Sequence, residues 1–407
     1  MGKSAKIKPT NLAHSLMISS DLLINNKNWK RLSRSWNSGK LPHALLFHGP
    51  EGTGKEGHAL ELAALLNCTT ITNDEPCGNC PSCKKTKSFQ HGNVKIIMPL
   101  PRGKIKSSDD SVEKAFSDSS LKEYWDLLKQ KKDDPYFPIR LTGANTILIN
   151  SIRDLKHDLA LSTINNEWRI ILIFQAEKLC IPSPEAAHSL LKVLEEPPEK
   201  TLFILVSSQP GAILDTIRSR CQSLYFPPIS VQILQDKLIQ TGADPVQAAV
   251  MVRISGGNVR LSQELIENST DLMEKLYLLL NACFSSDPSI WNKCIDTTAR
   301  LKTKDINQME QLFRCAVLFF RDLLYYSATG TDDEIIYKNK MNKIDKLTKS
   351  YSEADWHSCI QHIENTQNYI SRNGYLPLQI ICMILDIQKS LRGEIYEPFR
   401  LSDWTPV

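Results

Sequence analysis

Four short apolar runs organise the first half of the chain. They cover residues 41–48, 94–98, 169–174 and 201–208. Unbroken apolar runs of this length are typical of strands buried on both faces of a parallel sheet. Helical periodicity appears at residues 147–161 and within 183–200, where Pro197 and Pro198 end the helix because proline cannot continue its hydrogen-bond ladder. The alternation predicts an α/β fold whose sheet is covered by helices on both faces.

Strand-like runs stop in the second half, and helical periodicity replaces them. We expect three domains, which are an α/β domain over residues 1–228, a small helical domain over 229–268 and an all-helical domain over 269–407. Residues 99–138 carry charges of both signs and few aliphatic side chains. We interpret them as a surface insertion with one helix around residues 121–129.

The composition adds only broad limits. With 407 residues, 42% hydrophobic and 23% charged, the chain is globular and long enough for two or three domains. A net charge of +4 is too small to indicate nucleic-acid binding by itself. No apolar run reaches the roughly 18–20 residues of a membrane helix, and the first residues lack the apolar centre of a secretion signal. We therefore expect a cytoplasmic protein without membrane segments.

A glycine-rich sequence, GPEGTGKE, follows the first apolar run. Gly49, Gly54 and Lys55 match the spacing of a phosphate loop, and Gly52 lies between them. In such a loop backbone amides surround phosphate, the lysine reaches the outer phosphates and a hydroxyl binds magnesium. Here Glu56 replaces the hydroxyl residue, which adds negative charge near the phosphates. ATP or ADP binding is left open.

Hydrolysis also needs two carboxylates at the end of a neighbouring strand, one for magnesium and one to polarise water. Phe174 and Gln175 stand at those positions. Glu177 lies two positions later, and we expect it to be a solvated helix residue. Since phenylalanine cannot bind magnesium and an amide cannot act as a base, the sequence predicts no hydrolysis here.

Four of the eleven cysteines are close together, at Cys68, Cys77, Cys80 and Cys83. Four thiolates with this spacing predict a closed tetrahedral site for structural Zn²⁺. Free thiols, a redox pair and an iron–sulfur cluster are the alternatives.

The sequence TIRSRC follows the last apolar run. A fixed arginine at a domain edge can stabilise the phosphoryl group transferred in a neighbouring subunit. Taken alone, Arg218 and Arg220 also fit a solvated helix face.

The order of these motifs resembles bacterial clamp-loader subunits of the AAA+ class. The resemblance spans residues 41–226 apart from the insertion, and LLKVLEEPP and SRC are its most specific parts. Within that family the chain is similar to the delta-prime type of DNA polymerase III, which lacks the hydrolytic residues and keeps SRC. The gamma/tau type keeps the hydrolytic residues.

The resemblance implies roles for individual residues. Arg220 would be an arginine finger that reaches the ATP of an adjacent gamma/tau subunit, and the cysteines would form the family's zinc module. Arg260 would belong to the second sensor of a lid domain at residues 229–268, and Ser207 or Ser208 would lie near the first sensor. Residues 269–407 would form a collar that holds a hetero-pentamer with gamma/tau and delta subunits. That complex loads a sliding clamp onto primed DNA during replication.

Two other functions are compatible with parts of this sequence. An active gamma/tau-type ATPase would use Glu56 or Glu177 as a displaced carboxylate. A zinc-containing DNA-binding module is disfavoured by the small net charge and by the absence of a basic and aromatic stripe.

Overall fold

A computed structural model describes residues 17–160, 167–304, 306–371 and 375–394. The chain divides into two units, residues 1–228 and 229–407.

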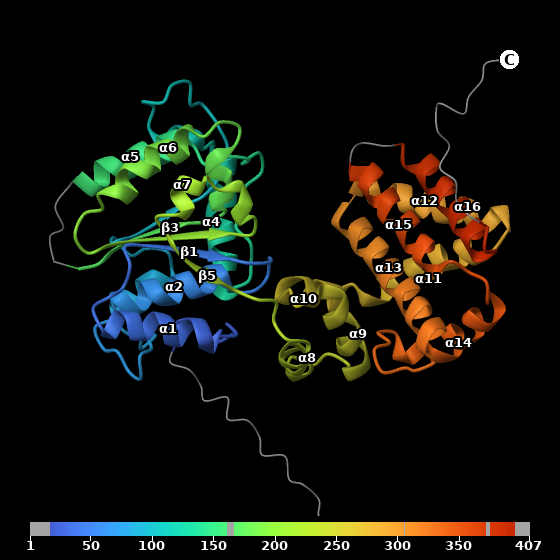
Figure 1. Ribbon diagram of the computed structural model, residues 1–407. Helices are drawn as coiled ribbons and strands as arrows, with labels where there is room; N and C mark the ends of the chain where they lie inside the picture. The colour runs from blue at the N-terminus through green and yellow to red at the C-terminus, as the bar shows by residue number, and fades with distance from the viewer. Residues whose placement is uncertain (1–16, 161–166, 305, 372–374, 395–407) are drawn as a thin grey trace, which may run out of the picture. The chain divides into compact units, whose positions relative to one another are not determined.

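A five-stranded parallel sheet forms the centre of the first unit (Figure 1). The strands are β1 (Ala44–His48), β2 (Val94–Ile97), β3 (Arg169–Ile173), β4 (Thr201–Ser207) and β5 (Gln222–Tyr225), in the order β2-β3-β4-β1-β5. The helices are α1 (Asn26–Asn37), α2 (Lys55–Leu66), α3 (Pro81–Lys87), α4 (Asp118–Asp133), α5 (Ile149–Ala160), α6 (Glu185–Glu195) and α7 (Asp215–Arg218). Short 3₁₀ turns are η1 (Val112–Ala115), η2 (Ala176–Cys180) and η3 (Pro210–Ala212).

Side chains of the central strands alternate between two cores. On β1, Leu45 and Phe47 belong to the core that includes α2, whereas Ala44 and Leu46 belong to the core that includes α5 and α6. Figure 1 shows these helices on opposite faces of the sheet. Because both faces are covered, the strands read as unbroken apolar runs. The predicted α/β fold is confirmed.

The insertion differs from its prediction. Its helix α4 is longer than expected, and Leu100, Ile105 and Leu128 are buried in the core that includes α2. Tyr136 is also buried. The expectation of a surface insertion is wrong for these positions, because a few apolar side chains on one face are enough to fix a mostly charged segment.

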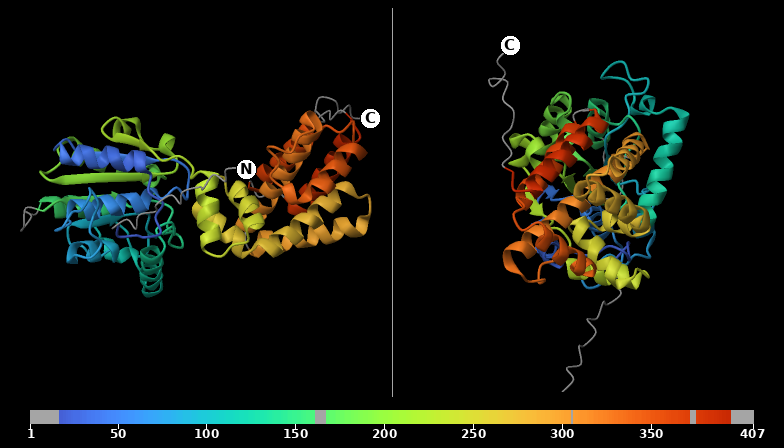
Figure 2. Two further views of the ribbon diagram at one scale, coloured as in Figure 1. Left: turned by 90° about the horizontal axis from the view of Figure 1, so that it is seen from below. Right: turned by 90° about the vertical axis from the view of Figure 1, so that its right-hand side faces the viewer.

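The described part of the second unit consists of helices joined by loops, with no strand (Figure 2). Its helices are α8 (Val231–Gln240), α9 (Pro245–Ser255), α10 (Val259–Glu267), α11 (Ser269–Phe284), α12 (Pro288–Lys304), α13 (Ile306–Thr329), α14 (Met341–Ser350), α15 (Trp356–Ser371) and α16 (Leu376–Leu391), with the 3₁₀ turn η4 (Lys338–Lys340). One core contains residues of both α9 and the later helices, among them Met251, Leu276 and Phe313. Buried Asp322 on α13 accepts hydrogen bonds from the backbone N–H groups of Ile336 and Tyr337.

Within the described ranges, none of the helices combines the length and the apolar character that crossing a membrane requires.

Candidate functional site

The glycine-rich loop connects the end of β1 to the start of α2, as a phosphate loop does. Gly49, Gly52 and Gly54 have φ values of 142°, 70° and 78°, a region that side chains disfavour. A Cβ atom on Gly49 would lie 2.1 Å from the carbonyl oxygen of Phe226. The glycines are therefore required by the backbone path.

Lys55 is the first residue of α2 and is only 6% exposed. Its Nζ donates to the carbonyl oxygens of Gly49 at 2.8 Å and Pro50 at 2.5 Å. Burial lowers the pKa of Lys55 to about 8, with Glu56 the largest opposing influence. A buried ammonium beside the N-terminus of a helix favours an anion at this loop.

Glu56, which stands at the magnesium-binding position, is paired within the chain. Its Oε2 lies 2.5 Å from Nζ of Lys131, on α4 of the insertion. The Lys131 side chain is 1% exposed, and its Nζ also donates to the carbonyl oxygen of Pro135 at 2.9 Å. Because it is paired with Lys131, the Glu56 carboxylate does not take over the role of the hydroxyl that binds magnesium in a phosphate loop.

The two expected acid positions lie at the end of β3. Phe174 is buried in the core, and Nε2 of Gln175 donates to the carbonyl oxygen of Ile139 at 3.1 Å. The Phe174 ring has no ligand atom for magnesium, and the Gln175 amide cannot accept a proton from water.

Glu177 contradicts its prediction as a solvated residue. It is 7% exposed, and its Oε2 has no hydrogen-bond partner among the residues that the structure describes. It is close enough to Lys55 to raise that group's pKa. The difference arises because Gln175 adopts a left-handed conformation, and the chain continues as the turn η2 instead of a solvated helix.

Side chains of α2 and the insertion hold the chain segment before α1. The carboxylate of Glu61 accepts from the N–H groups of Ile18 and Ser19, the hydroxyl of Tyr136 accepts from Leu23, and Nε2 of His58 accepts from Asn25. We call residues 18–25 the N-terminal strap. The strap lies against the start of α2. A Cβ atom on Gly54 would be only 2.9 Å from Cδ1 of Leu22, which shows how close the two segments are.

His58 is completely buried between the strap and the loop. Since Nε2 accepts from Asn25 at 2.8 Å, we assign the proton to Nδ1, which lies 2.7 Å from the carbonyl oxygen of Gly54. Burial lowers the pKa of His58 to about 4 and keeps the imidazole neutral.

Arg220 lies just after α7, with 36% of its side chain exposed. One terminal nitrogen donates to the carbonyl oxygen of Thr216 at 2.9 Å, and the other lies 2.7 Å from Oε1 of Glu195 at the end of α6. Nearby Arg218 is paired with Asp215 at 3.1 Å. Two fixed contacts orient the Arg220 guanidinium while leaving part of it accessible.

The four cysteine Sγ atoms lie within 4.8 Å of one another. Those of Cys68 and Cys80 are 4.0 Å apart, near the ~3.8 Å expected for two sulfurs on a tetrahedral zinc ion. The N–H groups of Cys77, Cys80 and Cys83 approach the sulfurs of Cys68, Cys77 and Cys80 at 3.3, 3.3 and 3.4 Å. The sulfur set and its N–H contacts fit a structural zinc ion, as the spacing predicts.

Two further predicted residues make local contacts. Oγ of Ser207 accepts from the N–H of Gln209 at 3.0 Å. Arg260 belongs to the second unit, where its Nε lies 2.9 Å from Oε1 of Glu264, one turn along α10. Their sensor roles stay predictions.

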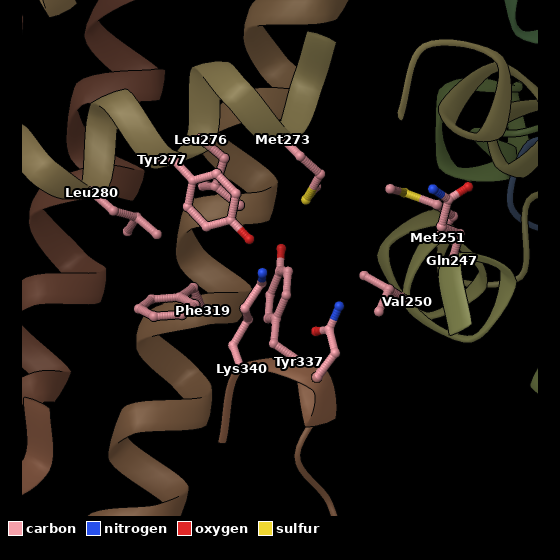
Figure 3. A pocket seen from close by; sticks show the side chains of 11 residues that line it. Gln247, Val250, Met251, Met273, Leu276, Tyr277, Leu280, Phe319, Tyr337 and Lys340 are labelled. Atoms are coloured by element: carbon pink, nitrogen blue, oxygen red, sulfur yellow. The ribbon is translucent and has the colours of Figure 1, made fainter. Parts of the chain in front are cut away.

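The second unit contains a cavity of about 190 Å³ among α9, α11, α13 and η4 (Figure 3). Its walls are mostly apolar, and Nζ of Lys340 lies 5.0 Å from the ring centroid of Tyr277. The eleven described residues that line it include no carboxylate, cysteine or histidine. Its titratable lining groups are Tyr277, Tyr337 and Lys340. The glycine-rich loop, the cysteine site and Arg220 all lie in the first unit.

Sequence reasoning missed Lys131, Glu195 and the strap-binding residues. Lys131 follows Leu128 by three positions, so the two share one face of α4. That spacing is the signal that could have placed Lys131 toward the core.

A phosphate loop on a parallel sheet, a four-cysteine site and a helical second unit define a clamp-loader subunit of the AAA+ class. The sequence profile described as "DNA polymerase III, delta subunit" matches residues 24–230, which are 207 of the 407 residues. The chain belongs to this family.

Individual relatives agree with this membership. The chain is 27% identical over 324 residues to the DNA polymerase III subunit delta' of Bacillus subtilis, covering 77% of the chain and 81% of the relative. It is 27% identical over 248 residues to subunit delta' of Yersinia pestis, covering 60% of each. It is 24% identical over 364 residues to subunit tau of B. subtilis, covering 80% of the chain and 56% of the relative. The chain thus spans less than two thirds of the last two proteins.

Proposed function

We propose that this chain is a delta-prime-like subunit of the DNA polymerase III clamp loader, which does not hydrolyse ATP itself. It supplies Arg220 to the ATP of an adjacent gamma/tau subunit. It acts with gamma/tau and delta subunits in loading a sliding clamp onto primed DNA.

The loss of all three magnesium- and water-handling positions carries this proposal. Glu56 is paired with Lys131, Phe174 is in the core, and Gln175 is bonded to a backbone carbonyl. Positioning and electrostatic stabilisation supply nearly all of the catalysis in phosphoryl transfer. A site without these groups retains little of it.

Arg220 supports the second part of the proposal. Its guanidinium is partly exposed, and Glu195 and the carbonyl of Thr216 hold it in a defined orientation. An oriented guanidinium can stabilise transition-state charge on a neighbour's nucleotide, and it needs no intact site in its own chain. The zinc ion has a structural role in this proposal, because four cysteines leave no open ligand position.

Reconstitution tests the proposal directly. The chain is mixed with the gamma/tau and delta subunits of its own genome, and DNA-stimulated ATP hydrolysis and clamp loading are measured. Arg220→Ala should leave assembly intact and lower hydrolysis at the site it serves on the order of 10³-fold.

Arg218→Ala is the matched control, since it removes the same charge two residues away. It should leave hydrolysis close to the wild-type rate. Equal rates for wild type and Arg220→Ala in an intact complex would refute the arginine-finger role.

Glu177 favours a second candidate, an ATPase of the gamma/tau type. A buried carboxylate near Lys55, one oxygen of which has no partner within the described part of the chain, could polarise water. Turnover by the isolated chain that disappears in both Lys55→Ala and Glu177→Gln would establish it. We expect no turnover, because no magnesium ligand is arranged at the Glu56 or Phe174 position.

A further inference from the structure

The position that holds magnesium in a phosphate loop is filled here by a side chain of the same protein. Nζ of Lys131 is 2.5 Å from Oε2 of Glu56, and the Glu56 side chain is 21% exposed. The lysine thus places a positive charge beside the residue that follows Lys55. A divalent cation at this position would be close to the Lys131 ammonium and repelled by it.

Lys131 is held there by packing as well as by charge. Its side chain is 1% exposed, and the carbonyl of Pro135 accepts a second hydrogen bond at 2.9 Å. A Cβ atom on Gly57 would lie 3.4 Å from Cβ of Pro135, so the insertion lies directly against the first turn of α2. Removing one partner of such a buried pair leaves an unpaired charge, which is strongly unfavourable.

The anion-binding half of the loop is retained. The three glycines keep their left-handed backbone conformations, and Lys55 lies inside the loop with only 6% exposure. Two buried ammonium groups, Lys55 and Lys131, therefore flank the start of α2. The residues fit phosphate and do not fit magnesium.

From this mismatch we infer that the loop has exchanged its divalent-metal position for an internal cation, Lys131, and binds a nucleoside di- or triphosphate without Mg²⁺. The inference concerns binding in this chain alone and is independent of the role of Arg220.

Fluorescence titration of the full chain with mant-ADP, in excess EDTA and in excess MgCl₂, tests it. The wild type should bind with the same affinity in both. Lys131→Met should bind about tenfold more weakly or worse in EDTA, because it removes a cation and leaves Glu56 unpaired. Mg²⁺ should restore part of that loss, since the freed Glu56 carboxylate can then ligate the metal.

Two variants control for charge and folding. Lys132→Met removes the same charge from the next, exposed position of α4 and should bind like the wild type. Lys131→Arg keeps the internal cation and should remain independent of Mg²⁺. The thermal unfolding of each variant shows whether the first unit is still folded.

Several outcomes would overturn the inference. One is that mant-ADP binding to the wild type collapses in EDTA. If the Mg²⁺-dependent binding then disappeared in Glu177→Gln, the metal would be assigned to the Glu177 carboxylate. Absence of mant-ADP binding to the wild type in both buffers is another, and so is an unchanged affinity in folded Lys131→Met. None of these results alters the Arg220 experiment, so the two proposals fail separately.

Discussion

Replacing His58 by leucine removes a buried neutral imidazole that connects the N-terminal strap to the phosphate loop. In the folded chain Nε2 accepts from Asn25 and Nδ1 faces the carbonyl of Gly54. The bond from Asn25 needs a neutral ring, because Nε2 must be free to accept, and the two contacts together fix the tautomer with the proton on Nδ1. Protonation must break the bond from Asn25 and place a charge in a fully buried site.

The size of the effect follows from the pKa of His58, which burial lowers from 6.5 to about 4. The unfolded chain binds a proton as pH falls below 6.5, while the folded chain stays neutral until about pH 4. The stabilisation is therefore complete above pH 6.5 and is lost as pH falls toward 4. Between pH 8 and pH 5 the loss is about 2 kcal/mol.

Urea unfolding of wild type and His58→Leu at the two pH values measures this loss. The variant should be less stable at pH 8, and its deficit should shrink by about 2 kcal/mol at pH 5. Taking the difference between the proteins cancels other groups, including Glu61. Burial raises the pKa of that carboxyl to about 8, which gives the opposite trend with pH.

The imidazole resonance of His58 gives an independent measurement. It is identified in a carbon–proton NMR spectrum by its absence from His58→Leu, and it should not titrate above about pH 5. A midpoint near 6.5, or a deficit that is equal at both pH values, would refute the buried neutral assignment.

Three other substitutions test separate features of the fold. Cys80→Ser should reduce bound zinc, measured by metal analysis, and lower the unfolding temperature; retention of one zinc per chain would contradict the four-cysteine site. Gly49→Ala should lower the free energy of unfolding of the first unit, measured in urea, by several kcal/mol, because its Cβ would clash with the carbonyl of Phe226. Gly39→Ala is the control: Gly39 also has a positive φ but has open space around it, so the loss should be only about 1 kcal/mol. Asp322→Asn should destabilise the second unit by about 1–3 kcal/mol, since an amide cannot accept as many of the backbone hydrogen bonds; equal stability would show that those bonds contribute little.

The sequence predicted four of the five described strands because each carries an apolar run. The central strands β1, β3 and β4 are almost fully buried, whereas β2 is a partly buried edge strand. The fifth, β5, was missed: only Leu224 of its four residues is buried, so it lacks an apolar run. It is an edge strand, paired with β1 alone in the described sheet. Helix α1 was also missed, since only a few of its positions are apolar among many polar ones.

The candidate site was predictable where a motif fixes the backbone, and less so where side chains from distant segments meet. Gly49 and Lys55 lie in the loop that their spacing indicates. Lys131 is 75 positions from Glu56, and no local pattern reveals that the two pair. Glu177 was misjudged because its burial depends on the turn after β3, which the unusual backbone of Gln175 starts.

The shared core of the second unit has a practical consequence for dissecting the protein. Val250 and Ile254 of α9 are buried in the same cluster as Leu276 and Phe313 of the later helices. A truncation after residue 268 would separate the α9 residues of that cluster from those of the later helices and expose apolar surface on both fragments. A truncation after residue 228 leaves the cluster whole, so residues 229–407 are the fragment to express when the helical part is studied alone.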